Sequence, residues 1–340
     1  MQQQRMKNKF VNKLIVPTGV VCILLAFITL HYAINPVDNQ NRTVIVNIPR
    51  GTGFFHTVAI LEKADLIKNK YLFYLLAISK NAQSHIKAGE YELATSLSPM
   101  DIIDKLVKGD ILSYEVTIPE DFTVNEIASR LASFNLVEEN AFLSLSSDVT
   151  FLASLGIEGR HAEGYLYPDT YRFDKSMSAK DIMRMMVTQF WKMFTPEMKK
   201  RTTEIGMTIP KVVTMASLVG KESGHKEEKP LISAVFHNRL KKRMKLQCDP
   251  TAVYDLKNFS GSITKKHLMR YTPYNTYLIS GLPPGPIANP AIDSLQAALY
   301  PAPVNYLYFV SNNDGSHQFS SNLSAHQKAV LKYQIKRKKE

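Results

Sequence analysis

The chain has 340 residues, of which 45% are hydrophobic and 21% charged, and it carries a formal net charge of +12 at pH 7. This length and composition exclude a disordered tail and predict two or three folded units with a sizeable core. Only two cysteines are present, Cys22 and Cys248, which excludes a disulfide framework and a cysteine metal site.

The N-terminal region contains an uncharged apolar run. Residues 14–34 reach the length of about 20 residues that a membrane-spanning helix needs. A cleaved signal peptide is the alternative, but the run is longer than such a segment and no Ala-x-Ala pattern follows it. Basic residues precede the run: Arg5, Lys7, Lys9 and Lys13. The positive-inside rule therefore predicts a cytoplasmic tail over residues 1–13, a single-pass anchor in the cytoplasmic (inner) membrane, and an extracytoplasmic (periplasmic) remainder.

Basic residues cluster in the N-terminal flank, at Arg239–Lys245 and at Lys336–Lys339. Because the bulk of the chain is expected outside the cytoplasm, no nucleic acid partner is predicted. Anionic lipids or an anionic wall polymer are the expected partners of a basic surface there. Solvated basic faces without any partner are the alternative.

Residues 43–118 are predicted to form a βααβ module followed by a helix and a strand. The segment TVIVNIPRG alternates like a strand, and AGEYELA at Ala88–Ala94 is typical of a second one. A helix should begin after Ser98, an N-cap residue with Asp101 three positions later, and should end at Gly109. Such a module more often binds or positions a ligand than catalyses.

A second copy of the pattern starts seventy positions later. VNIPRG at Val46–Gly51 matches VTIPED at Val116–Asp121, and the leucines after the first helix match as well. Two copies are too few for a solenoid, so the chain contains a duplicated small α/β unit. Residues 119–150 are assigned to this second repeat and its connecting helices.

Residues 151–335 are predicted to form a further, catalytic domain. Helices are expected at Ala179–Phe194, Pro210–Ser223 and Lys229–Lys242, and the Pro- and Gly-rich residues 281–290 predict a shaped loop. Residues 306–320 predict a hairpin that turns at Asp314 and Gly315. Helices that precede a few strands indicate the α+β fold class.

Glu222 is the strongest candidate for a catalytic group. At helical spacing it shares one face with Val212, Met215 and Val219, so it is expected to be partly buried. A buried acid either has its pKa raised for proton transfer or is paired in an ion pair. The ion-pair alternative has a partner available in Lys226, four residues later.

Two further segments supply polar groups suited to a hydroxylated substrate. Gln247, Asp249 and Thr251 alternate along LQCDPTAVYDL, although an Asp-Pro helix start is the simpler interpretation of that turn. Asn275 and Tyr277 lie beside the shaped loop, where an amide and an aromatic face suit a sugar-binding cleft.

HAEGYLYPDTY offers Glu163 and Asp169 as a second carboxylate. A separation of about 5 Å from Glu222 would favour a retaining glycosidase, and a wider gap an inverting one. The sequence contains no Gly-x-Ser-x-Gly elbow, no phosphate-binding loop and no His-Glu-x-x-His motif. Neither a metal nor another cofactor is therefore expected.

Eight ordered segments resemble the endolytic murein transglycosylase, or YceG-like, family. They are VNIPRG, AGEYEL with SPMDIIDKL, TIPEDFTVNEIASRLA, EGYLYPDTY, ASLVGKES, VFHNRLKKRMKLQCDPTAVY, YNTYLISGLPPGPIANP and GSHQFS, and they cover the chain after the apolar run. The resemblance implies a membrane-anchored enzyme with a LysM-like module that cuts nascent peptidoglycan strands, near peptidoglycan polymerases such as penicillin-binding proteins.

The resemblance also implies site roles. It places the family's catalytic glutamate on Glu222, and substrate positioning is expected from Gln247, Asp249, Thr251, Asn275, Tyr277 and Glu163. Two positions depart from the family pattern, because Gly220 stands where an acidic residue is common and Cys248 where a small hydroxyl residue is.

The implied reaction is lytic cleavage of the bond between N-acetylmuramic acid and N-acetylglucosamine, with closure of a 1,6-anhydro ring and termination of strand growth. A single acid suffices for this chemistry. A non-catalytic peptidoglycan-binding scaffold and a lysozyme-like hydrolase remain the alternatives.

Overall fold

The computed structural model describes residue 20, residues 23–256 and residues 259–335. The chain divides into two compact units, Met1–Tyr114 with Asp174–Ser176, and Glu115–Phe173 with Met177–Glu340. Helices and strands occur in both, so the described residues form a mixed α and β structure. The division into domains at 118/119 and 150/151 stays a prediction.

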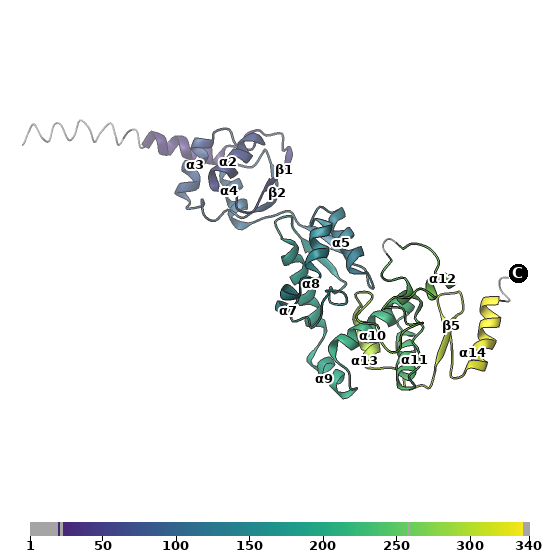
Figure 1. Ribbon diagram of the computed structural model, residues 1–340. Helices are drawn as coiled ribbons and strands as arrows, with labels where there is room; N and C mark the ends of the chain where they lie inside the picture. The colour runs from purple at the N-terminus through teal and green to yellow at the C-terminus, as the bar shows by residue number, and fades with distance from the viewer. Residues whose placement is uncertain (1–19, 21–22, 257–258, 336–340) are drawn as a thin grey trace, which may run out of the picture. The chain divides into compact units, whose positions relative to one another are not determined.

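The first unit contains a βααβ arrangement followed by one helix. Its elements are β1 (Thr43–Ile48), α2 (Phe54–Lys63), α3 (Lys70–Ser79), β2 (Gly89–Ala94) and α4 (Pro99–Lys108) (Figure 1). β1 and β2 pair antiparallel, from Thr43 opposite Ala94 to Ile48 opposite Gly89. The order of elements expected from the sequence is confirmed, whereas the LysM-like character of the module stays a prediction.

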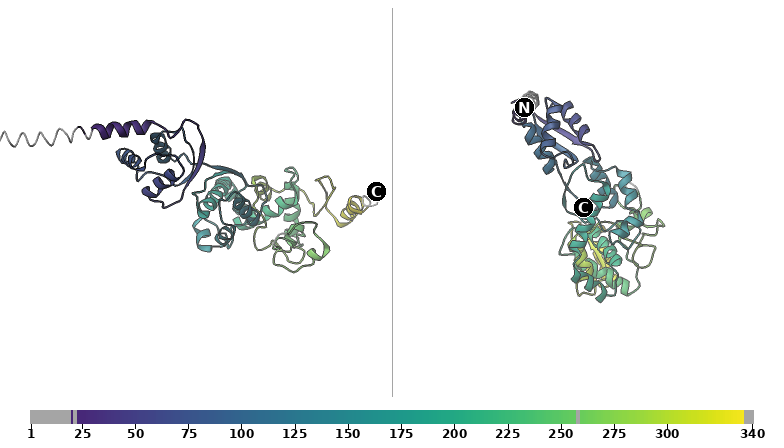
Figure 2. Two further views of the ribbon diagram at one scale, coloured as in Figure 1. Left: turned by 90° about the horizontal axis from the view of Figure 1, so that it is seen from above. Right: turned by 90° about the vertical axis from the view of Figure 1, so that its left-hand side faces the viewer.

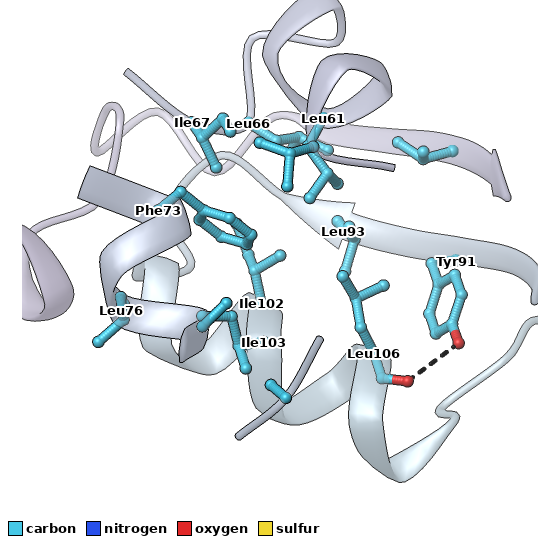
Figure 3. Packing of buried hydrophobic residues seen from close by; sticks show 14 of the residues in the cluster. Leu61, Leu66, Ile67, Phe73, Leu76, Tyr91, Leu93, Ile102, Ile103 and Leu106 are labelled. Carbon is cyan, nitrogen blue, oxygen red and sulfur yellow. Dashed lines mark hydrogen bonds between the residues drawn. The ribbon is translucent and has the colours of Figure 1, made fainter. Parts of the chain in front are cut away.

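The helices of this unit pack with the strand pair around one hydrophobic cluster. Leu61, Phe73, Leu93 and Leu106 all lie within it and are inaccessible to solvent. Figure 3 shows these side chains converging from α2, α3, β2 and α4. Tyr91 is equally buried, and its hydroxyl donates to the backbone carbonyls of Lys87 at 2.7 Å and Leu106 at 3.3 Å, which satisfies its polar end.

α4 begins and ends as its sequence predicts. Ser98 accepts from the backbone N–H of Asp101, and the Asp101 carboxylate in turn accepts from the N–H of Ser98 at 3.2 Å. Gly109 ends the helix with φ at +76°, in the left-handed region that glycine adopts at little cost.

A helix precedes β1 and ends at Ile34, and it runs into the first unit (Figure 1, Figure 2). Tyr32 and Ala33 are buried in the hydrophobic cluster, but the apolar side chains of Ile23, Phe27 and Leu30 are exposed. No helix among the described residues is long and apolar enough to cross a bilayer. The predicted tail over residues 1–13 and residues 14–19, 21 and 22 of the predicted anchor lie outside the described residues.

The two copies of the repeat adopt the same local backbone. Asp65 and Asn135, which follow the first helix of each copy, both have a left-handed φ, of 55° and 54°. The next residue in each case donates its N–H back to the last leucine of the helix, Leu66 to Leu61 at 3.0 Å and Leu136 to Leu131 at 3.2 Å. The same turn also follows α3, where Asn81 has a φ of 53° and Ala82 donates to Ala77 at 2.9 Å, so the duplication itself stays a prediction.

The second unit is mostly helical, with two short strand pairs. Its elements up to α9 are β3 (Tyr114–Thr117), α5 (Val124–Ser133), α6 (Glu139–Leu145), α7 (Val149–Ser154), β4 (Thr170–Phe173), α8 (Ala179–Met193) and α9 (Pro196–Glu204). Those that follow are α10 (Ile209–Glu222), α11 (Lys229–Lys241), the 3₁₀ helix η1 (Asp249–Ala252), α12 (Lys265–Leu268), α13 (Ile292–Leu299), β5 (Tyr308–Ser311), β6 (His317–Ser320), α14 (Leu323–Val330) and the π-helical turn η2 (Leu331–Ile335). β3 pairs with β4, and β5 with β6.

α10 is the central helix of this unit. Every residue from Val212 to Gly220 is buried, because α11, α13 and η1 all pack against the helix. The sequence predicted a single buried face through Val212, Met215 and Val219, and that prediction is too narrow. The hydroxyl of Ser217 accepts from the N–H of Ile287 at 3.0 Å, which ties the Pro- and Gly-rich loop to α10.

The predicted C-terminal hairpin is confirmed. β5 and β6 pair antiparallel from Tyr308 opposite Ser320 to Ser311 opposite His317. Asn313 and Gly315 adopt positive φ in the turn between them, at 63° and 89°. The turn lies at the predicted Asp-Gly pair, but positive φ falls on Asn313 and Gly315 and not on Asp314, so this is a longer loop than the two-residue Asp-Gly turn.

Phe190 tests the packing of the second unit. It is fully buried on α8 against Tyr165, Trp191 and Phe194. Phe190→Ala should destabilise this unit by about 3–5 kcal/mol because it leaves a cavity. Urea unfolding followed by Trp191 fluorescence measures the change. The control Tyr271→Ala removes a ring that is 84% exposed and should stay within about 0.5 kcal/mol of the parent; equal losses in both variants would contradict the packing described.

Candidate functional site

Glu222 is the last residue of α10, and Ser223 follows it as the C-cap in an extended conformation. The residue is half-buried, so its side chain is neither fully enclosed nor free in solvent. η1, which begins at Asp249, packs against α10. The end of the buried central helix therefore meets the loop that the sequence had identified as polar.

The carboxyl group of Glu222 is held by η1. It accepts hydrogen bonds from the thiol of Cys248 and from the backbone N–H of Asp249. Burial raises the pKa of Glu222 to about 7, and the negative charge of Asp249 acts in the same direction. The two hydrogen bonds and the charge of Arg239 oppose that rise. A carboxyl with this pKa can hold or release a proton near neutral pH.

Cys248 is a hydrogen-bond donor in this site, and its thiol stays protonated. The residue is fully buried, and burial, with the negative charge of Glu222, raises the pKa of its thiol well above the usual range. A protonated thiol can donate only weakly to a carboxylate. Cys248 thus stabilises the ionised form of Glu222 less than a serine or threonine hydroxyl would.

Asp249 and Tyr277 lie beside Glu222 as a bonded pair. The phenol of Tyr277 donates to the carboxylate of Asp249. Burial, followed by this bond and the Asp249 charge, raises the pKa of Tyr277, so the phenol stays protonated. Asp249 is exposed and Tyr277 half-buried, so both can be reached from solvent next to the Glu222 carboxyl.

Arg239 is the residue of this site that the sequence did not reveal. It belongs to a basic run that the sequence predicted to be surface, but only 7% of it is exposed. Its guanidinium donates to the carbonyls of Leu307 at 2.7 Å, Leu246 at 2.9 Å and Lys245 at 3.2 Å. Both interpretations of the basic run, a surface for anionic partners and a solvated face, place it at the surface, and both are wrong for Arg239, because one guanidinium can satisfy several buried carbonyls at once.

Arg239 also positions Gln247. Its guanidinium donates to the side-chain oxygen of Gln247 at 3.0 Å, and Gln247 has a left-handed φ of 51° in an exposed position. The same guanidinium lies 5.2 Å from the ring centre of Tyr308 in β5. One buried side chain thus links α11, the loop before η1 and the hairpin.

Thr251 and Asn275 are fully buried and support the loops from behind. The Thr251 hydroxyl donates to the carbonyl of Cys248 at 2.6 Å and lies 2.9 Å from the hydroxyl of Thr276. The Asn275 amide donates to the carbonyls of Leu268 and Arg270 and accepts from the N–H of Tyr277. These contacts favour positioning of Cys248 and Tyr277, and the direct substrate contact expected of Thr251 and Asn275 stays a prediction.

Glu163 lies in a separate buried network. Its carboxyl accepts from the N–H of Val124 at the start of α5 at 3.1 Å, from the phenol of Tyr254 at 2.9 Å and from the amide of Asn289 at 2.7 Å. Burial raises the pKa of Glu163 to about 7, against the bonds from Val124 and Tyr254. Only 3% of the residue is exposed. The geometry favours a structural junction, and the predicted role of Glu163 in substrate binding stays untested.

Asn289 completes that junction and was not singled out in the sequence. Its side-chain oxygen accepts from the N–H groups of Gly164 and Leu166, both at 2.9 Å, and its amide also donates to the carbonyl of Phe122. It therefore fastens the end of the Pro- and Gly-rich loop to the segment that contains Glu163. The unusual composition of that loop was the only signal in the sequence that pointed to it.

Asp169, the other candidate for a second carboxylate, lies elsewhere. It lines a shallow hollow of about 650 Å³ beside β4 and α8, and Gln189 donates to it at 2.8 Å. None of the residues that line this hollow belongs to the group around Glu222. In the part of the chain that the structure describes, no cluster of three or more His, Cys, Asp or Glu residues could hold a metal ion.

Comparison with known proteins places this geometry in a family context. The model of the YceG-like family matches residues 46–332. An endolytic murein transglycosylase of Bacillus subtilis (strain 168) is 34% identical over 91% of this chain and 90% of its own length. An endolytic murein transglycosylase of Streptococcus pneumoniae (serotype 2) is 29% identical over 88% of this chain and 60% of its own length. The crystal structure of a yceG-like protein from Listeria monocytogenes superposes with a TM-score of 0.59 at 34% identity, over 85% of this chain and all of that one.

The raised pKa of Glu222 predicts a pH-dependent stability. Between pH 4.5 and about 7 the folded chain retains a proton that the unfolded chain has lost. The stabilisation that this retained proton provides is fully present below pH 4.5 and is lost as the pH rises through about 7. The free energy of unfolding therefore falls over that pH window. Glu222→Gln removes this dependence. Urea unfolding of the parent and of the variant, measured below and above this pH window, should therefore show that the variant gains stability relative to the parent as the pH rises. A difference in stability that does not change with pH would contradict the raised pKa of Glu222.

Arg239 provides a second test of the site. Lysine cannot reproduce the branched set of hydrogen bonds, so Arg239→Lys should leave buried carbonyls unpaired and lower the free energy of unfolding by about 1–3 kcal/mol. Hydrogen exchange should become faster at the backbone amides of residues 246–249. Arg243→Lys is the matched control in the same basic run, since Arg243 is exposed; a comparable effect there would argue against a special role for Arg239.

Proposed function

This chain belongs to the YceG-like family, and on that premise we propose that it is an endolytic murein transglycosylase, acting within peptidoglycan glycan strands. The observation that supports the chemistry is the half-buried carboxyl of Glu222, whose pKa is raised to about 7. A group that is protonated in a large fraction of molecules at neutral pH can act as a general acid.

We further propose that the reaction is lytic, a carbon–oxygen lyase reaction without water. Protonated Glu222 donates to the oxygen that links N-acetylmuramic acid to N-acetylglucosamine, as the bond breaks through an oxocarbenium-like state. The carboxylate then removes the proton of the muramyl C6 hydroxyl, whose oxygen attacks C1 and closes the 1,6-anhydro ring. Glu222 both donates the first proton and removes the second one. The buried Glu163 and Asp169, which lies elsewhere, therefore need no part in the reaction.

The surroundings of Glu222 fit both halves of this cycle. Burial favours the protonated form that begins the reaction, while the Asp249 N–H, the Cys248 thiol and the charge of Arg239 favour the carboxylate that forms next. Opposing effects of this kind bring a pKa close to the working pH. Exposed Gln247 and Asp249, with Tyr277 beside them, are the groups proposed to hold the sugar.

Membrane attachment is part of the proposal. The exposed apolar side chains of the helix that ends at Ile34 continue the uncharged run that starts at residue 14. A single-pass anchor in the cytoplasmic membrane, with the N-terminus cytoplasmic, accounts for this surface. The cleavage site would then act on newly made strands outside that membrane, in the neighbourhood of peptidoglycan polymerases such as penicillin-binding proteins.

The decisive variant is Glu222→Gln, which keeps the shape of the side chain but cannot transfer the proton. Release of 1,6-anhydro-muramyl products from purified glycan strands should fall by about 100 to 10,000-fold. Mass spectrometry measures these products. Glu227→Gln is the control, because Glu227 is an exposed glutamate only five residues away, and its activity should equal that of the parent.

The same assay separates the alternatives. Products heavier by one water would identify a lysozyme-like hydrolase. Strand binding without any new chain ends, unchanged by Glu222→Gln, would identify a non-catalytic scaffold. Full activity of the Glu222→Gln variant would reject the assignment of the catalytic acid.

A further inference from the structure

The first unit carries an exposed apolar surface. It consists of Phe55 on α2 and of Tyr71, Leu75 and Ile78 on α3, here called the α3 outer face. These four side chains are 70%, 68%, 47% and 53% exposed. Scattered exposed apolar residues are ordinary, but a contiguous group of this kind marks an interaction surface.

The α3 outer face is an ordered surface. Tyr71, Leu75 and Ile78 follow one another at intervals of four and three residues, so they lie on the same side of the helix. The half-buried ring of Tyr74 lies 5.1 Å from the ring of Phe55 and 6.3 Å from that of Tyr71, both edge to face. The aromatic side chains of α2 and α3 thus support one another.

α3 is apolar on its inner side as well. Phe73, Leu76 and Ala77 point into the hydrophobic cluster of the first unit and are buried. A surface helix of a soluble module normally has a polar outer side. The apolar outer side of α3 therefore indicates a binding partner, in addition to the core that the inner side of the helix covers.

Lysines lie at both ends of this face. Lys70 is the first residue of α3, and its ammonium is 5.6 Å from the ring centre of Tyr71. Lys80 is the C-cap of the same helix. Both ammonium groups are paired within the unit, Lys70 with Glu62 at 3.3 Å and Lys80 with Asp104. Aromatic and aliphatic side chains framed by lysines are the combination that suits the boundary between lipid head groups and acyl chains.

The helix that ends at Ile34 is fixed to the same unit. Tyr32 and Ala33 are buried in the cluster that also contains Phe73, and the Lys68 ammonium donates to the carbonyl of Pro36 at 3.2 Å. Figure 1 shows this helix entering the unit beside α3. Because the junction is packed rather than a free linker, a membrane that holds the helix also holds this module at its surface.

We propose that the α3 outer face rests in the head-group region of the membrane that the N-terminal helix enters. The partner is a lipid surface, whose boundary between head groups and acyl chains suits the exposed aromatic and aliphatic side chains of this face. This inference rests on the proposed membrane attachment and not on the proposed cleavage reaction. Its consequence is a module held in one orientation on the bilayer.

The test places a tryptophan at the face in the full chain, in vesicles of anionic phospholipids with brominated acyl chains. In Tyr71→Trp the added fluorescence should be quenched by the brominated lipid relative to ordinary lipid. Tyr271→Trp is the matched control, since Tyr271 is also an exposed tyrosine but lies in the second unit; its added fluorescence should not change. Phe55→Trp gives a second reporter on the same face.

Flotation of the same vesicles and the release of anhydro products are measured in parallel. Quenching at positions 55 and 71 but not at 271 supports the proposal. Protein that floats with the vesicles without quenching at 55 and 71 overturns it, while leaving the anchor and the reaction intact. Protein that does not float overturns the membrane attachment and this inference together. A tryptophan signal that responds to added glycan strands and not to brominated lipid would identify the face as a glycan surface and also overturn the proposal.

Discussion

A carboxyl group that must give up a proton near neutral pH has to be partly withdrawn from water and yet remain reachable. Glu222 meets this constraint because it ends a helix that is buried on all sides. The helix brings the side chain into the interior, and its end leaves one side half open. The balance between burial and the donors of η1 then brings the pKa to about 7.

The loops around Glu222 are held by buried polar side chains, because loops have few hydrogen bonds of their own. Arg239, Thr251 and Asn275 each pair with backbone carbonyls behind the site. Removing such a buried donor lowers the free energy of unfolding by more than the hydrogen bond contributes. The carbonyl left behind then has neither a protein partner nor water to bond. In the proposed reaction these residues therefore act through the positions of Cys248, Asp249 and Tyr277.

In the first unit, too, packing decides which side chains are buried, but the surface that stays exposed is apolar. Its cluster is closed by apolar side chains from every element, including Tyr32 and Ala33 of the preceding helix. What remains outside is unusually apolar, namely the exposed side of that helix and the α3 outer face. In the proposed membrane attachment, one bilayer covers both of these apolar surfaces.

The sequence by itself determined the local features, since caps, turns and strand alternation depend on neighbouring residues. The sequence predicted the cap of α4 by Ser98 and Asp101, the end of that helix at Gly109, the hairpin turn at Gly315 and the repeated strand–helix pattern. It also identified Glu222 as a candidate from its residue type and its position on a helix. Only the tertiary structure decided that α10 is buried on every side, that Arg239 is interior, that Glu163 joins Asn289 and Tyr254, and that Thr251 and Asn275 face the interior. These depend on contacts between residues up to 126 positions apart, and local periodicity does not specify which distant carbonyl or carboxylate a polar side chain will meet.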